Sequence, residues 1–167
     1  MIADAREGEK GMAEGPFRRI DQRVYVAPQL VPEDFAAARA AGVRTVVNNR
    51  PDGEAPDQLD SAEAERLATE AGLDYVHIPV PLGGLTGEMA EAFGRTLAES
   101  QGPLLAYCRS GTRSCTLWAI AAAGRGEPVE GVIATAGRAG YDLAGARPML
   151  ERSAATGGSR QPDTSQR

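Results

Sequence analysis

Short apolar segments rich in β-branched residues alternate along this chain with longer segments that favour helices. Strands are expected at 23–27, 43–48, 75–80 and 103–107. Helices are expected at 32–42, 61–71, 86–100, 114–123, 129–139 and 143–152. Because strands separated by helices need crossover connections, they form parallel sheets whose two faces are covered. The sequence therefore predicts an α/β fold with a central, mostly parallel sheet and helices on both faces.

The length of 167 residues suits a single domain, which we place at residues 16–152. Residues 1–15 and 153–167 are rich in polar residues and glycine, and they lack hydrophobic periodicity. Such segments bury too little apolar surface to offset the entropy lost on ordering. We therefore expect a disordered tail at each end of the domain.

Composition excludes several function classes. The net charge of −5 argues against a general nucleic-acid binder. No apolar run approaches the roughly 20 residues of a membrane-spanning helix, and residues 1–15 lack the apolar centre of a signal peptide, so we expect a cytoplasmic protein without membrane contact. Two cysteines and one histidine do not suggest a disulfide framework or structural zinc, and no metal or cofactor is expected.

The chemistry is expected at the loop between the strand at 103–107 and the helix at 114–123. Ligands bind at the carboxyl ends of parallel strands, and this loop starts at such an end with Cys108. Its backbone N–H groups and the following helix N-terminus form an anion cradle, in which a cysteine thiolate is a nucleophile. Cys108 and Arg113 are the candidate catalytic residues. The candidate oxyanion- and substrate-binding residues are Arg109, Ser110, Gly111, Thr112, Ser114 and Arg50.

Several segments together resemble known families. The matching segments are 48–54 (Asn-Asn-Arg-Pro-Asp-Gly-Glu), 77–80 (His-Ile-Pro-Val), 106–114 around Cys108, 117–118 (Leu-Trp) and 139–143 (Ala-Gly-Tyr-Asp-Leu). The order of elements resembles the dual-specificity and tyrosine phosphatases. Residues 17–152 resemble the bacterial phosphatase-like domains related to the N-terminal part of β-lactamase-hydrolase-like proteins. This resemblance implies a cysteine-phosphatase-like architecture, and that family carries two activity labels, phosphatase and sulfurtransferase.

The chain departs from the phosphatase pattern at three points. Tyr107 stands where those enzymes have histidine, four residues instead of five separate Cys108 from Arg113, and the loop 81–86 has no carboxylate to act as general acid. General acid catalysis is worth about 10² to 10⁴ in rate. Asp52 is a candidate replacement acid. The sequence Cys-Arg-Ser-Gly-Thr-Arg instead resembles the active loop of rhodanese-type sulfurtransferases, whose leaving groups need no such acid.

We therefore expect a cysteine-dependent sulfurtransferase that carries a persulfide on Cys108. The alternative is a phosphatase that forms a phosphocysteine at Cys108, and a second alternative is a non-catalytic oxyanion-binding module. The expected ligand is a small sulfur- or phosphate-containing anion. A persulfide dioxygenase acting in the same pathway is the partner that fits the sulfurtransferase hypothesis.

Other chemically active residues have structural as well as functional interpretations. The hydroxyl of Ser114 is expected to bond to the thiolate, and His77 is expected to be a hydrogen-bonded strand residue. Cys115 is interpreted as a buried structural thiol, with resolution of an oxidised Cys108 as the functional alternative. Tyr141 and Asp142 match the family's closing motif, but packing and helix capping explain them equally well.

Overall fold

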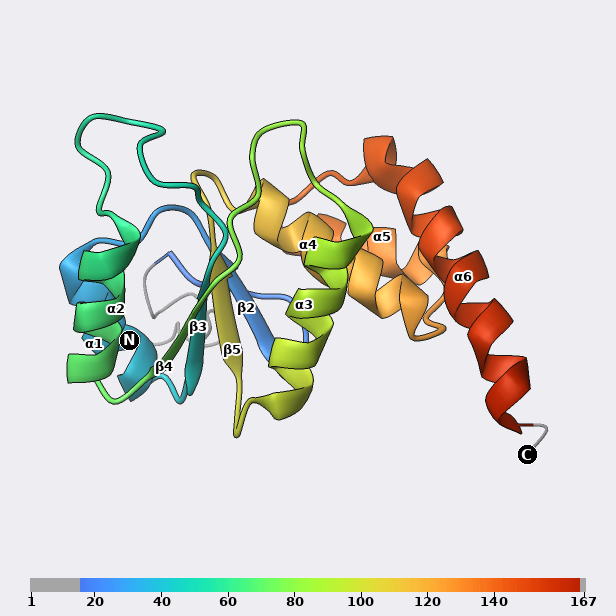
Figure 1. Cartoon of the computed structure of the whole chain (residues 1–167), viewed down its shortest axis with the longest axis horizontal. Coiled ribbons are helices and arrows are strands. Elements are labelled where there is room, and N and C mark those ends of the chain that lie inside the picture. Colours follow the sequence, from blue (N-terminus) through green and yellow to red (C-terminus); the bar gives the residue numbers. More distant parts are fainter. Residues whose placement is uncertain (1–15, 166–167) are drawn as a thin grey trace, which may run out of the picture.

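The computed structural model describes the backbone of residues 16–165 and the side chains of residues 16–157. Its sheet has the strand order β1-β2-β5-β3-β4 (Figure 1). The strands are β1 (Arg18–Arg19), β2 (Val24–Ala27), β3 (Thr45–Asn48), β4 (Asp74–His77) and β5 (Leu104–Tyr107). All neighbouring strands are parallel except β1, which pairs antiparallel with β2. The mostly parallel sheet is confirmed. The two-residue β1 has no sequence signal of its own.

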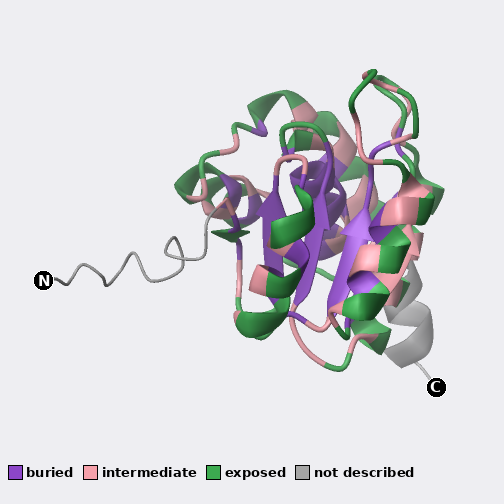
Figure 2. Cartoon of the chain, turned by 90° about the vertical axis from the view of Figure 1, so that its left-hand side faces the viewer, coloured by how far each residue is buried: buried purple, intermediate pink, exposed green. Residues whose placement is uncertain are grey.

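Helices cover both faces of the sheet, as predicted. They are α1 (Pro32–Ala40), α2 (Ser61–Glu70), α3 (Gly87–Glu99), α4 (Thr112–Gly124), α5 (Val129–Arg138) and α6 (Arg147–Ser165), with a short 3₁₀ helix at Ala144–Ala146. α1 and α2 lie on one side of the sheet, and α3 to α6 lie on the other (Figure 1). The central strands are therefore enclosed, and they form the buried interior in Figure 2.

The side chains of strand β5 pack alternately into two hydrophobic cores, one on each face of the sheet. Leu104 and Ala106 pack with the helices α3 to α6, whereas Leu105 and Tyr107 pack with α1 and α2. This alternation follows from the two-residue period of a strand. The position that holds histidine in the phosphatases is thus occupied by a tyrosine that packs on the α1 and α2 side.

Helix α4 runs through the centre of the larger core, and nine of its 13 residues are buried. It starts at Thr112, two residues before the predicted start. Arg113 therefore belongs to the first turn of the helix, directly after the Cys108 loop. The helix is fixed at its far side by the indole of Trp118, which donates a 3.0 Å hydrogen bond to Asp21.

Helix α6 extends beyond residue 152, where the sequence analysis placed the start of a disordered tail. The Ser153 hydroxyl donates to the carbonyl of Ile120 at 2.9 Å, and a Cβ at Gly157 would lie 2.1 Å from the carbonyl oxygen of Gly124. Small residues thus allow α6 to pack closely on α4, and this contact needs no apolar periodicity. The boundary at 152 was therefore set too early. The predicted tail at 1–15 and residues 166–167 lie outside the described residues.

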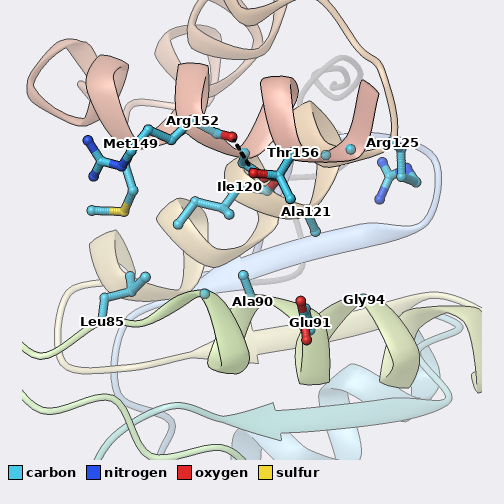
Figure 3. Close-up of a pocket in the computed structure, with 14 residues that line it drawn as sticks. Leu85, Ala90, Glu91, Gly94, Ile120, Ala121, Arg125, Met149, Arg152 and Thr156 are labelled. Atoms are coloured by element: carbon cyan, nitrogen blue, oxygen red, sulfur yellow. Dashed lines mark hydrogen bonds between the residues drawn. The ribbon is translucent and has the colours of Figure 1, made fainter. Parts of the chain in front are cut away.

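A groove of about 810 Å³ lies between α3 and α6, and Figure 3 shows Ala90 and Glu91 on one side of it and Met149 and Arg152 on the other. Its lining residues come from α3, α4, α6 and the loop before α3. The groove is thus separate from the Cys108 loop. Within the described part of the chain, no helix combines the length and apolar character needed to span a bilayer.

Candidate active site

Cys108 directly follows β5, which lies between β2 and β3. Because β2, β3, β4 and β5 are parallel, the loops after them leave the sheet at the same end, the upper end in Figure 1. The Cys108 side chain is buried. The nucleophile predicted from the sequence thus lies at the centre of the edge where ligands bind in open α/β sheets.

The loop curls back so that its backbone faces the sulfur. The Gly111 N–H group donates a 3.1 Å hydrogen bond to Cys108 Sγ. Gly111 is also the N-cap of α4 and has a φ of 99°, a left-handed conformation that glycine adopts without steric cost. The N-terminus of α4 adds a partial positive charge at the same point. Together these features make an anion site next to Cys108.

Tyr141 closes the other side of this loop. Its hydroxyl donates a long, 3.4 Å hydrogen bond to the Ser110 carbonyl. A Cβ at Gly111 would lie 2.3 Å from that hydroxyl oxygen, so the tyrosine leaves no room for a side chain. Burial raises the pKa of Tyr141, and the hydroxyl is therefore protonated at neutral pH. Tyr141, from the motif at 139–143, thus packs against the loop and helps to hold it in place.

We expect Gly111→Ala to reduce the reactivity of Cys108 by about 100-fold, because the loop must shift and a positive φ becomes strained. Alkylation of Cys108 by iodoacetamide measures this directly, with Tm as the folding control. Tyr141→Ala in the same chain removes the clash but leaves the strain, so it should restore reactivity only in part. Unchanged alkylation in Gly111→Ala would contradict the assignment.

Arg113 is held by a carboxylate that the sequence analysis did not single out. Glu54 accepts hydrogen bonds from Arg113 Nη1 at 2.7 Å and Nη2 at 2.9 Å, and from Arg50 Nε at 2.9 Å. Arg113 Nη1 also donates to the carbonyl of Val80 at 2.7 Å. The contacts with Glu54 and Val80 use three of the five guanidinium N–H groups of Arg113. The other two, Nε–H and one on Nη2, remain as donors to an oxyanion. Arg113 also interacts electrostatically with Cys108.

The two arginines fix the charge of Glu54. The hydrogen bonds from Arg113 and the one from Arg50 lower the pKa of Glu54 to about 2, against the opposing effect of desolvation. Glu54 in turn raises the pKa of Arg113. Glu54 is therefore ionised at neutral pH, and it can orient Arg113 but cannot supply a proton.

Arg50 is buried next to this cluster. Besides Glu54, its guanidinium contacts Gln29 Oε1 at 2.9 Å. The ring of His77 lies 3.0 Å from the Arg50 carbonyl and supports the turn, in agreement with a hydrogen-bonded strand residue. The sequence predicts Arg50 at the edge of the sheet that carries Cys108. Glu54 links the Arg50 guanidinium to that of Arg113.

Two predicted roles do not match the contacts. Ser114 Oγ donates to Asn49 Oδ1 at 2.8 Å, so its single proton is not directed at the thiolate. Asp52 is exposed, and its carboxylate accepts the Ser61 N–H at 2.8 Å at the start of α2. That is a helix-capping contact, and the acid role of Asp52 has no contact to support it.

The other candidate binding residues of the loop lie at its surface. Arg109, Ser110 and Thr112 are exposed around the loop, and Ser110 Oγ donates to Thr112 Oγ1 at 3.1 Å. Cys115 is buried, and this burial, with the nearby Cys108, raises its pKa to about 12. It is a protonated thiol at neutral pH, in line with a structural residue. Substrate binding by the exposed loop residues remains a prediction.

Known proteins match most of this chain. A family model described as the phosphatase-like domain of β-lactamase hydrolase-like proteins matches residues 16–125. The β-lactamase hydrolase-like protein of Agrobacterium fabrum is 37% identical over 138 residues, which are 82% of this chain and 32% of that protein. Its counterpart in Xylella fastidiosa strain 9a5c is 34% identical, over 81% of this chain and 32% of that protein. This chain thus spans about a third of the length of these curated relatives.

Solved structures give the same fold. A provisionally assigned phosphatase from Neisseria meningitidis Z2491 is 33% identical with a TM-score of 0.74, and the match covers 81% of this chain and 96% of that one. PTPMT1 is 16% identical with a TM-score of 0.72, over 88% and 99% of the two chains, and shows likeness of fold. The sheet, the cysteine loop and these matches lead to one conclusion: this chain belongs to the family of phosphatase-like domains of β-lactamase hydrolase-like proteins.

Proposed function

We propose that this chain is a cysteine-dependent phosphatase that hydrolyses phosphate monoesters through a phosphocysteine at Cys108. The observation that carries the proposal is the position of Cys108 Sγ, 3.1 Å from the Gly111 amide at the N-terminus of α4, next to an arginine held by Glu54. The family and the solved relatives favour this alternative over the sulfurtransferase expected from the sequence.

The reaction has two steps. The Cys108 thiolate attacks phosphorus, and the S–P bond forms as the P–O ester bond breaks. The leaving group departs with the bonding electron pair as an alkoxide or aryloxide and takes a proton from solvent. Water then attacks the phosphocysteine, and the P–S bond breaks to return the thiolate and release inorganic phosphate. The loop amides and Arg113 stabilise the charge on the phosphoryl oxygens in both transition states.

The ionised state of Glu54 predicts which esters react. Because Glu54 cannot protonate a leaving group, kcat/KM should fall steeply as the pKa of the leaving alcohol rises. We expect p-nitrophenyl phosphate to react about 10² to 10⁴ times faster than an alkyl phosphate. A series of substituted phenyl phosphates measures the slope. If kcat/KM did not depend on the pKa of the leaving alcohol, a general acid other than Glu54 would be required. Asp52 would then be the candidate, and Asp52→Asn tests it.

Sulfur transfer remains a second candidate because one observation favours it. The only carboxylate in contact with Arg113 among the described residues is ionised, and sulfite or a thiolate leaves without an acid. The Cys108 thiolate would attack the outer sulfur of thiosulfate, forming an S–S bond as sulfite departs with its electron pair. An acceptor thiolate would then attack the outer sulfur of the persulfide, and the S–S bond to Cys108 would break to return the Cys108 thiolate. A persulfide dioxygenase would be the partner in that pathway.

A further inference from the structure

Two large apolar side chains are exposed, one on the loop that follows β2 and one on the loop that follows β4. Val31 is 51% exposed and Leu82 is 73% exposed. Among the described residues they are the two large hydrophobic side chains that are mostly exposed. Single exposed apolar residues are common on protein surfaces and need no explanation. Their shared relation to the Cys108 loop distinguishes these two.

Val31 follows the strand next to β5. Two residues before it, the Gln29 N–H donates a 3.1 Å hydrogen bond to the Arg109 carbonyl of the loop. The Val31 N–H is itself bonded to Asp34 Oδ2 at 2.9 Å at the start of α1. The backbone thus anchors Val31 beside the loop, and its side chain faces solvent.

Leu82 lies in the loop that follows β4. Two residues before it, the Val80 carbonyl accepts the 2.7 Å hydrogen bond from Arg113. Leu82 occupies the corner of a turn in which the Gly84 N–H bonds to the Pro81 carbonyl at 2.9 Å, and Gly83 has a φ of 72°. The turn holds Leu82 outward at a fixed point.

Each exposed side chain therefore lies two residues from a hydrogen bond to the segment Cys108–Arg113, and the two approach it from different loops. Both loops leave the carboxyl ends of parallel strands at the upper end of the sheet in Figure 1. Two exposed apolar side chains are therefore carried by loops that hydrogen-bond to the segment around the anion cradle.

We propose that Val31 and Leu82 form an apolar rim that binds the non-anionic end of the substrate. This inference deepens the proposed function: the substrate class is a monoester that joins a small oxyanion to an alkyl or aryl body. Covering about 60 Å² of apolar surface corresponds to about a tenfold gain in affinity. The anion contributes binding free energy that all such esters share. Contact with the rim makes the affinity depend on the alkyl or aryl body of the ester.

The test compares two probes with the same headgroup, methylphosphonate and octylphosphonate, by calorimetry on the full chain carrying Cys108→Ser. We expect octylphosphonate to bind about tenfold more tightly. Val31→Thr and Leu82→Asn keep the side-chain shapes but make them polar, and together they should reduce this preference to less than threefold. Leu82→Met keeps an apolar side chain and should retain the preference. Phenylphosphonate as a third probe separates aryl from alkyl bodies.

Equal binding of both probes to the Cys108→Ser chain would overturn the rim, as would a preference that the polar variants leave unchanged. Equal loss of both probes in the polar variants would also overturn it, because the two side chains would then support the cradle itself. If neither phosphonate binds, the phosphate proposal fails. The rim is then tested with methanesulfonate and octanesulfonate. These probes carry a sulfonate in place of the phosphonate and have the same two chain lengths, methyl and octyl.

Discussion

Cys108→Ser is expected to abolish turnover and every covalent adduct, whichever group the protein transfers. A serine hydroxyl has nearly the size of the thiol and can still accept the Gly111 N–H bond, so the anion site should persist. It is not ionised at neutral pH, and no base in contact with it is seen among the described side chains. We expect a loss in kcat of at least about 10⁴-fold.

Intact mass after rapid quenching measures this effect and identifies the cargo. Incubation with an aryl phosphate should add a phosphoryl group to the parent protein and nothing to Cys108→Ser. Incubation with thiosulfate tests the second candidate: an added sulfur that cyanide removes, without a phosphoryl adduct, would replace phosphate by sulfur as the cargo. A Cys115→Ser chain is the matched control, because Cys115 is a buried, protonated thiol and should leave both adducts intact. A Cys108 that forms no adduct would support the binding-module alternative.

The sequence was enough to place Cys108 because local sequence patterns determine where each strand ends. An apolar segment of four or five residues bounded by turn residues forms a strand, and strands separated by helices align in parallel. The carboxyl end of each such strand then lies at one edge, whatever the order of strands in the sheet. Both Cys108 and Arg50 follow strands, so both were expected at this edge without knowledge of their distance.

The role of Glu54 could not be predicted in this way. Asp52 and Glu54 are two residues apart in the same turn, and both are acidic with polar neighbours. The fold directs Asp52 to the start of α2 and Glu54 to Arg113, a residue 59 positions later. The choice depends on side-chain directions in an irregular loop, which neither periodicity nor propensity encodes. The spacing of four between Arg50 and Glu54 was a weak signal, since it brings side chains together reliably only in a helix.

The structured start of the predicted C-terminal tail was missed for a related reason. Ser153 and Gly157 belong to a segment without an apolar stripe, and their contacts with α4 depend on close backbone approach. Hydrophobic periodicity detects burial of large side chains. A helix that packs through glycine, alanine and serine has little of that signal.

Glu54→Gln should have the second largest effect, although Glu54 does not contact the nucleophile. Glutamine has the same size but lacks the charge that holds Arg113 and Arg50, and its amide nitrogen would face guanidinium donors. Arg113 would then lose its fixed orientation, and a misplaced oxyanion donor costs about 10²-fold in kcat/KM. Because Glu54 acts through Arg113, it is a positioning residue. The effects of Glu54→Gln and Arg113→Lys on kcat should therefore be far from additive in the double variant.

Stability provides a readout that is independent of turnover. The folded-state pKa of Glu54 lies at about 2, below the ordinary value of 4.5. A carboxylate with a lowered pKa contributes stability that is fully present above pH 4.5 and is lost as the pH falls towards 2. Since Glu54 is partly open to solvent, we expect this contribution to be about 1 to 2 kcal/mol.

Urea unfolding at pH 7, 4 and 3 should therefore show a smaller pH dependence for Glu54→Gln than for the parent chain. Glu63→Gln is the matched control, because it removes an exposed ion pair with Arg66 on α2. Exposed pairs contribute little, so this variant should keep both its activity and most of its pH dependence. If Glu54→Gln and Glu63→Gln gave equal activity and equal unfolding curves, Glu54 would have no part in holding Arg113. The oxyanion site would then depend on the loop amides alone.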